Sequence, residues 1–82
     1  MPQKTLREHM AEMTGPEIAD ALGASQSAAW MVRAGRRSVT LRRLRSFMEH
    51  VGADRLDLVL TIHEEAARAD EITRRRRADR EH

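Results

Sequence analysis

Apolar residues recur along the first fifty positions at the spacings of three and four residues that are typical of short amphipathic helices. Three apolar faces follow this pattern: Leu6, Met10 and Met13, then Ile18, Ala19 and Leu22, and then Leu41, Leu44, Met48 and Val51. The first face predicts a helix over about residues 2–13, with Pro2 in its first turn. We therefore expect a mainly all-α domain of four to five helices.

Residues that start and end helices lie between these apolar faces. The candidate N-caps, whose hydroxyls can accept from free backbone N–H groups, are Thr14, Ser25 and Thr40. The glycines that stand where helices would end are Gly23, Gly35 and Gly52. Thr14 is followed three residues later by Glu17, which is the spacing of a capping box. Between Ser25 and Gly35 these signals predict a third short helix over about residues 26–34.

The stretch RLDLVLTI at residues 55–62 fits two kinds of element. The residues that alternate with a period of two, and so predict a strand, are Leu56, Leu58, Leu60 and Ile62. The residues that would instead form a helical face are Leu56, Val59, Leu60 and His63. We favour the strand, because the alternation covers four positions without a break. Residues 64–76 are predicted to be helical, and residues 77–82 to form a disordered tail.

Arginine is concentrated in one part of the chain, although the formal net charge is only +2. The arginines between residues 33 and 45, a stretch without any acid, are Arg33, Arg36, Arg37, Arg42, Arg43 and Arg45. A run of charge is most often a solvated face, but such a cluster also suits the phosphates of a nucleic acid. A second run, Arg74–Arg77, is balanced by nearby acids. We interpret it as solvated surface, with a basic arm as the alternative.

Two short helices joined by LGAS have the spacing of a helix-turn-helix, whose second helix can enter a major groove about 12 Å wide. IADALGASQS, followed eight residues later by GRRSVTLRRLRSFMEHVG, resembles the Cro and lambda-repressor-like (XRE) helix-turn-helix family over about residues 5–52. The resemblance implies a compact helical domain that binds double-stranded operator DNA, usually as a homodimer. The continuation HVGADRLDLVL is similar to antitoxins of that family, in which a strand after the helices often makes a dimer contact.

This resemblance assigns roles to residues by position. Base contacts would come from the third helix, at Gln26, Ser27, Ala28, Trp30 and Met31, while Ala29 and Val32 match inward positions. Phosphate contacts would come from Ser25, Arg33, Arg36, Arg37, Arg42, Arg43 and Arg45. The dimer interface would be formed by Leu56, Leu58, Leu60 and Ile62. Family members commonly carry polar residues at the outward positions, so Trp30 has a second interpretation, in which it packs in the core, on another subunit or on a protein partner.

We therefore expect residues 1–53 to form a DNA-binding domain and residues 54–76 to serve dimerisation or a partner. The expected function is that of a sequence-specific transcriptional regulator, in the simplest case a homodimeric repressor on a pseudo-palindromic operator. The alternative is an antitoxin that binds a protein toxin through its C-terminal segment and can also repress its own operon. A helix-turn-helix scaffold turned to protein binding is a third possibility.

The sequence offers little other chemistry. The chain has no cysteine, and its histidines show no metal-ligand spacing: His9, His50, His63 and His82. HEEAA at residues 63–67 lacks the second histidine of a zinc-protease motif. We expect no cofactor, no metal and no enzymatic activity. No apolar run approaches the roughly 18 residues that a membrane span needs, so we expect a cytoplasmic protein, bacterial or phage-encoded, without a membrane partner.

Overall fold

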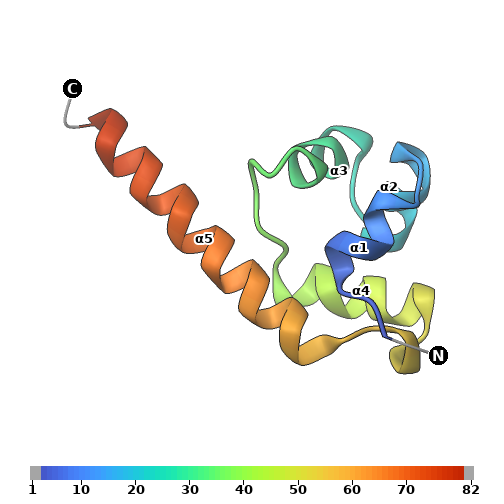
Figure 1. Ribbon diagram of the computed structural model, residues 1–82. Helices are drawn as coiled ribbons and strands as arrows, with labels where there is room; N and C mark the ends of the chain where they lie inside the picture. The colour runs from blue at the N-terminus through green and yellow to red at the C-terminus, as the bar shows by residue number, and fades with distance from the viewer. Residues whose placement is uncertain (1–2, 81–82) are drawn as a thin grey trace.

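The computed structural model describes residues 3–80 of the chain, and an all-α fold is confirmed for this range (Figure 1). In this range the elements follow one another as α1 Leu6–Ala11, α2 Gly15–Leu22, α3 Gln26–Arg33, α4 Leu41–Val51, the short 3-10 helix η1 Ala53–Arg55, and α5 Leu58–Arg80. The first four helices gather into one body. α5 runs along this body and then projects beyond it, so that the Cα trace measures 46 × 26 × 20 Å.

The helix starts and ends predicted from single residues are confirmed. Three hydroxyls accept from a backbone N–H three residues later: those of Thr14, Ser25 and Thr40. The three predicted glycines all adopt positive φ angles at or just after helix ends: Gly23, Gly35 and Gly52. The boundaries of α2, α3 and α4 are therefore set by local signals that can be read from the sequence.

α1 is shorter than the predicted helix over residues 2–13. It begins after Thr5, which forms a capping box with Glu8. Just before this cap, the backbone of Lys4 pairs with the chain on either side of Leu56, which holds the segment extended. Pro2, placed in the predicted first turn, lies outside the described residues.

The core of the body consists of apolar side chains from α1 to α4 and from the segments beside them. These residues are Leu6, Met10, Ile18, Ala19, Ala21, Leu22, Ala29, Val32, Val39, Leu44, Phe47 and Leu56. Burial of each large apolar side chain contributes about 1.5–3 kcal/mol. Most residues of the predicted apolar faces lie in this core or pack against it. The exception is Leu41 at the start of α4, which is 75% exposed.

The strand predicted for residues 55–62 is wrong. Within residues 55–62, the structure has a single isolated parallel bridge, between the extended residue Leu56 and Lys4. The Asp57 carboxylate then accepts from the N–H of Leu60 at 3.1 Å, as an N-cap residue does, and α5 begins directly after Asp57. The leucines therefore alternate in sequence without sharing a sheet face, because a local cap turns the chain into a helix.

α5 also extends further than predicted. It continues to Arg80, so the predicted disorder is wrong for residues 77–80, while residues 81–82 lie outside the described range. Arg75 pairs with Glu71, four residues earlier, at 2.8 Å. Pairs of this kind and a high content of arginine, alanine and glutamate both favour a helix.

Polar groups attach α5 to the body. Thr61 and Glu65, one turn apart, are its buried residues. The Thr61 hydroxyl accepts from the N–H of Leu6 at 3.1 Å, and the Glu65 carboxylate accepts from the N–H of Val39 at 2.8 Å. Because the buried side of α5 is polar, the helix is only weakly amphipathic in sequence.

Candidate nucleic-acid interface

α2 and α3 are joined by a tight turn at residues 23–25. Gly23 has a φ of +64°, and a Cβ at this position would lie 3.3 Å from the Oγ of Ser46 in α4. The N–H of Ala24 donates to the carbonyl of Ala19 at 2.9 Å and closes the end of α2. The turn therefore requires a small residue that tolerates a left-handed backbone, and it delivers the chain to the N-cap of α3.

α3 has one side in the core and one side in solvent. Ala29 and Val32 are buried, as predicted. The five residues predicted to meet base edges all keep solvent contact: Gln26, Ser27 and Trp30 are exposed, and Ala28 and Met31 are half-buried. The structure thus brings these five residues to the accessible surface of a single helix.

Trp30 does not pack in the core of the protomer, because it is 58% exposed. The guanidinium carbon of Arg36 lies 5.5 Å from the centroid of the indole ring, which is within the range of a cation–π interaction. This contact keeps Arg36, which lies in the loop after α3, next to the exposed side of that helix. Trp30 therefore belongs to the candidate nucleic-acid-binding surface on the outer side of α3, where its indole ring lies beside the positive charge of Arg36.

The arginines of the cluster differ in what they contact. Those exposed around the end of α3, the following loop and the start of α4 are Arg33, Arg36, Arg37, Arg42 and Arg45. Arg45 makes a loose pair with Glu49 at 3.7 Å, with both side chains largely exposed. Arg43 is half-buried and donates to the carbonyls of Leu22 and Gly23. Arg43 thus stabilises the end of α2, whereas the other five arginines point to solvent.

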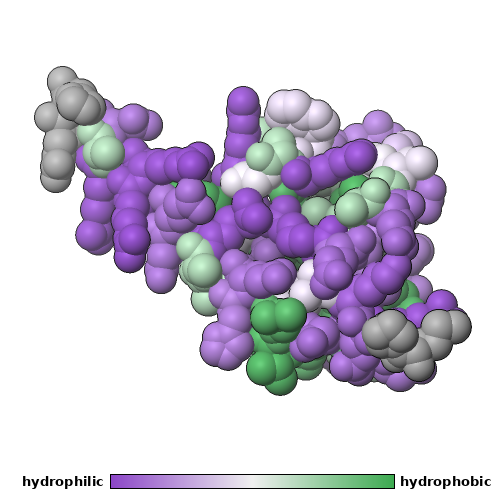
Figure 2. Space-filling view, viewed as in Figure 1, coloured by the Kyte–Doolittle hydropathy of each residue, from purple (hydrophilic) through white to green (hydrophobic). Residues whose placement is uncertain are grey.

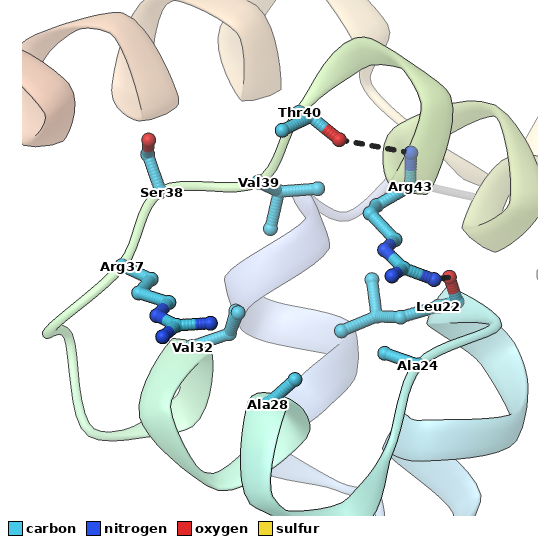
Figure 3. Close-up of a pocket in the computed structure, with 9 residues that line it drawn as sticks. All are labelled: Leu22, Ala24, Ala28, Val32, Arg37, Ser38, Val39, Thr40 and Arg43. Carbon is cyan, nitrogen blue, oxygen red and sulfur yellow. Dashed lines mark hydrogen bonds between the residues drawn. The ribbon is translucent and has the colours of Figure 1, made fainter.

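A hollow of about 220 Å³ separates α3 from the loop and the first turn of α4 (Figure 3). Its floor is apolar, with Ala28 and Val32 from α3 and Val39 from the loop. Figure 3 shows the side chain of Arg37 extending over Val32, and Arg43 reaching the end of α2 on the opposite side. The hollow is smaller than the 300–1,000 Å³ that is usual for small-molecule sites. It is therefore a surface depression next to the exposed arginines.

The half-buried Arg7 and the buried Glu65 form an ion pair that sequence reasoning missed. The Arg7 Nε and Nη2 atoms donate to the two carboxylate oxygens of Glu65 at 3.0 and 2.9 Å. Arg7 also donates to the carbonyls of Val32, near the end of α3, and of Arg37, in the loop. One guanidinium thus connects α1, α5 and the candidate surface. A separation of 58 residues left no local signal for this pair.

The residues predicted to form a dimer interface divide into two groups. Leu56 is 2% exposed and belongs to the core of the protomer. Leu58, Leu60 and Ile62 remain exposed in the first two turns of α5, together with Val59. Figure 2 shows green apolar atoms at the lower edge of the molecule, in the region where α5 begins in Figure 1. This exposed apolar surface lies within one short segment of α5.

A scan against protein-family models and searches of curated proteins and of solved structures gave no match to this chain. Within residues 3–80, no group of histidine and acidic side chains is arranged to hold a metal ion. No helix in that range combines the length and the apolar character needed to cross a membrane. The candidate surface of α3 and its neighbouring arginines therefore has to be interpreted from its own geometry.

Proposed function

We propose that this protein is a sequence-specific DNA-binding regulator that places α3 in the major groove. The observation that carries the proposal is the accessible outer side of α3, with Arg33, Arg36 and Arg37 exposed at and just after its C-terminal end; Arg42 and Arg45 are also exposed, at the start of α4. A helix with its side chains is about 10–12 Å across, and the major groove is about 12 Å wide. The helix-turn-helix resemblance of residues 5–52 supports the same role.

α3 would contact the bases in two ways, through hydrogen bonds and through apolar contacts. Gln26 and Ser27 are exposed at its N-terminal end, and a glutamine amide can pair with the N6 and N7 atoms of adenine. Ala28 and Met31 offer apolar atoms that suit a thymine methyl group. Trp30 offers a flat apolar face to the sugar edge of the groove. Sequence discrimination would rest mainly on Gln26, because most of the other side chains have little hydrogen-bonding capacity.

The exposed arginines would bind the phosphate backbone and set the register of α3. Each neutralised phosphate contributes about −0.9 to the slope of log affinity against log salt, so five contacts per protomer give a slope of about −4.5. Arg43 is not counted, since its guanidinium is engaged at the end of α2. Phosphate contacts supply affinity without sequence information.

A homodimer would complete the regulator. One recognition helix reads only a few base pairs, whereas two helices about 34 Å apart read two half-sites of a pseudo-palindrome. The exposed residues Leu58, Val59 and Ile62 of α5 offer an apolar surface for a second copy. We expect a dimer by sedimentation equilibrium and a monomer for Ile62→Glu. An unchanged mass for Ile62→Glu would remove this segment from the interface.

The first experiment is binding of the purified protein to DNA from its own upstream region, with random DNA beside it, across a salt series. Specific regulators bind their sites typically 10³–10⁷ times more tightly than random DNA. Affinity that is equal on both DNAs would contradict a sequence-specific regulator. The single Trp30 supplies an intrinsic fluorescence signal for this titration, because it is exposed on α3.

Two matched pairs of variants test the assignment of the surface. Gln26→Ala is expected to weaken specific binding tenfold or more, whereas Gln3→Ala, an exposed glutamine beside η1, should not. Arg36→Ala should reduce the magnitude of the salt slope by about 0.9 per protomer, whereas Arg55→Ala in η1 should leave it unchanged. If Gln26→Ala changes neither affinity nor base preference, α3 does not read bases through this residue.

The exposed apolar residues of α5 also favour a second candidate function. A protein toxin bound by Leu58, Val59 and Ile62 would make the chain an antitoxin, which is compatible with repression of its own operon. Co-purification of a stoichiometric toxin encoded by the neighbouring gene would favour this function. In that case the toxin, and not a second copy of the chain, occupies this surface, so Ile62→Glu should lose the toxin while the oligomeric state and the DNA affinity stay unchanged.

A further inference from the structure

The C-terminal part of α5 carries strong positive charge on an exposed, ordered helix. Between Ile72 and Arg80 the sequence has five arginines and one acid. Every residue of this stretch except Ile72 is exposed. Within the described range, Arg75 pairs with Glu71, whereas Arg74, Arg76 and Arg77 have no acidic partner within 4.0 Å. This part of α5, residues 72–80, is therefore a basic rod, although the sequence predicted a disordered tail from residue 77 onward.

The basic rod begins beside the end of α3. A Cβ on Gly35, in the loop after α3, would lie 2.7 Å from the Nη1 of Arg68 in α5. From this point α5 projects away from the body on the side of the α3–α4 loop (Figure 1). The exposed arginines of the loop and those of α5 are therefore close in space, although they are about forty residues apart in the chain.

A shared hollow joins the two groups of arginines. It has a volume of about 370 Å³, and its charged lining residues are Arg36 and Arg37 from the loop and Arg76 from α5. Among residues 3–80, none that lines this hollow is acidic. Like charges gathered without acids repel one another, and an anion that binds among them relieves this repulsion. The hollow thus joins the positive side chains of the loop after α3 to Arg76 of α5.

We propose that the basic rod of α5 is a second phosphate-contacting surface, which binds the backbone of the same DNA duplex that α3 enters. This inference rests on the proposed function and adds a contact outside the helix-turn-helix. Arg76 and Arg80 are four residues apart and share one side of α5, on which Arg76 borders the hollow. They are separated by about 6 Å along the helix axis, at 1.5 Å per residue. That distance matches the spacing of neighbouring phosphates on one strand.

Two double variants of the same helix test the proposal. Arg76→Ala with Arg80→Ala removes the arginines on the side that borders the hollow, and we expect the magnitude of the salt slope to fall by about 1.8 per protomer, at about 0.9 per phosphate. Arg74→Ala with Arg77→Ala removes the same charge from residues that do not line this hollow, and the slope should stay within error of the parent. Alanine is the best helix former, so both variants keep α5 helical, as circular dichroism will verify.

The outcomes separate this inference from the proposed function. A slope reduced only by the Arg76 and Arg80 changes, and restored when both are lysine instead, supports a specific phosphate contact. Equal slopes for the parent and both variants, with specific DNA binding intact, overturn the α5 contact and leave the function of α3 standing. Equal losses in both variants also overturn it, since they show a diffuse charge effect. A parent protein that does not bind DNA contradicts the proposed function itself.

Discussion

Replacing Glu65 by alanine tests the buried contact that fastens α5 to the body. The Glu65 side chain is 7% exposed and that of its partner Arg7 is 17% exposed. The carboxylate accepts three hydrogen bonds, two from Arg7 and one from the N–H of Val39. In Glu65→Ala, the guanidinium of Arg7 and the N–H of Val39 lose this acceptor at a site with little solvent access.

The expected loss can be estimated from these contacts. Removing one member of a buried ion pair costs about 3–5 kcal/mol. Arg7 keeps its bonds to the carbonyls of Val32 and Arg37, so we take the lower end, about 3 kcal/mol. A domain of this size has a free energy of unfolding of roughly 4–12 kcal/mol. The variant should therefore lose a large part of its stability, with Tm lowered by about 12–24 °C.

Urea unfolding followed by circular dichroism measures the effect, with three further variants as references. Glu64→Ala, at the exposed neighbouring position, should change the free energy of unfolding by less than about 0.5 kcal/mol. Glu65→Gln keeps an acceptor for Val39 and should lose about 1–2 kcal/mol. Arg7→Met combined with Glu65→Leu removes both charges and should be more stable than Glu65→Ala. Equal stabilities of Glu65→Ala and Glu64→Ala would refute the assignment of the ion pair as the main attachment of α5.

Three smaller predictions concern single positions. Gly35→Ala should lower the free energy of unfolding, measured in urea, by about 1–2 kcal/mol because φ at this position is +78°. Gly15→Ala is the control and should not destabilise the protein, since no atom lies within 4 Å of an added Cβ. Equal effects of the two substitutions would contradict the role of the backbone angle at Gly35. Trp30→Ala should change the free energy of unfolding by less than about 1 kcal/mol, since only a cation–π contact is lost, and a larger loss would contradict its exposure. A hydrogen bond from Lys4 at 2.6 Å, and then the charge of Lys4, lower the pKa of Glu12. The stabilisation by this pair is therefore present above the unfolded-state pKa and fades as pH falls through the folded-state value. Lys4→Met should raise the Glu12 midpoint in an NMR titration, and an unmoved midpoint would exclude the pair.

Local signals determined the helical framework of the first fifty residues. The hydroxyls of Thr14, Ser25 and Thr40 and the glycines after α2, α3 and α4 act within one helical turn, so their effect can be read without the rest of the chain. Ala29 and Val32 were placed inward by the helix-turn-helix resemblance, and the structure buries them. The same resemblance predicted which residues of α3 face outward as candidate base contacts, and the structure leaves these residues accessible to solvent.

Tertiary structure decided where the C-terminal third lies on the body. The helix after Leu56 starts at a local cap by Asp57, a signal that the alternating leucines obscured, whereas the bridge between Leu56 and Lys4 exists only in the folded chain. The Arg7–Glu65 pair joins residues 58 positions apart, so no local spacing encodes it. Arg36 and Arg76, forty positions apart, line one hollow only because α5 lies beside the loop after α3. Helix caps form between residues that are neighbours in the sequence, so they can be predicted from the sequence. The placement of a helix on the body depends on contacts that exist only after the chain has folded.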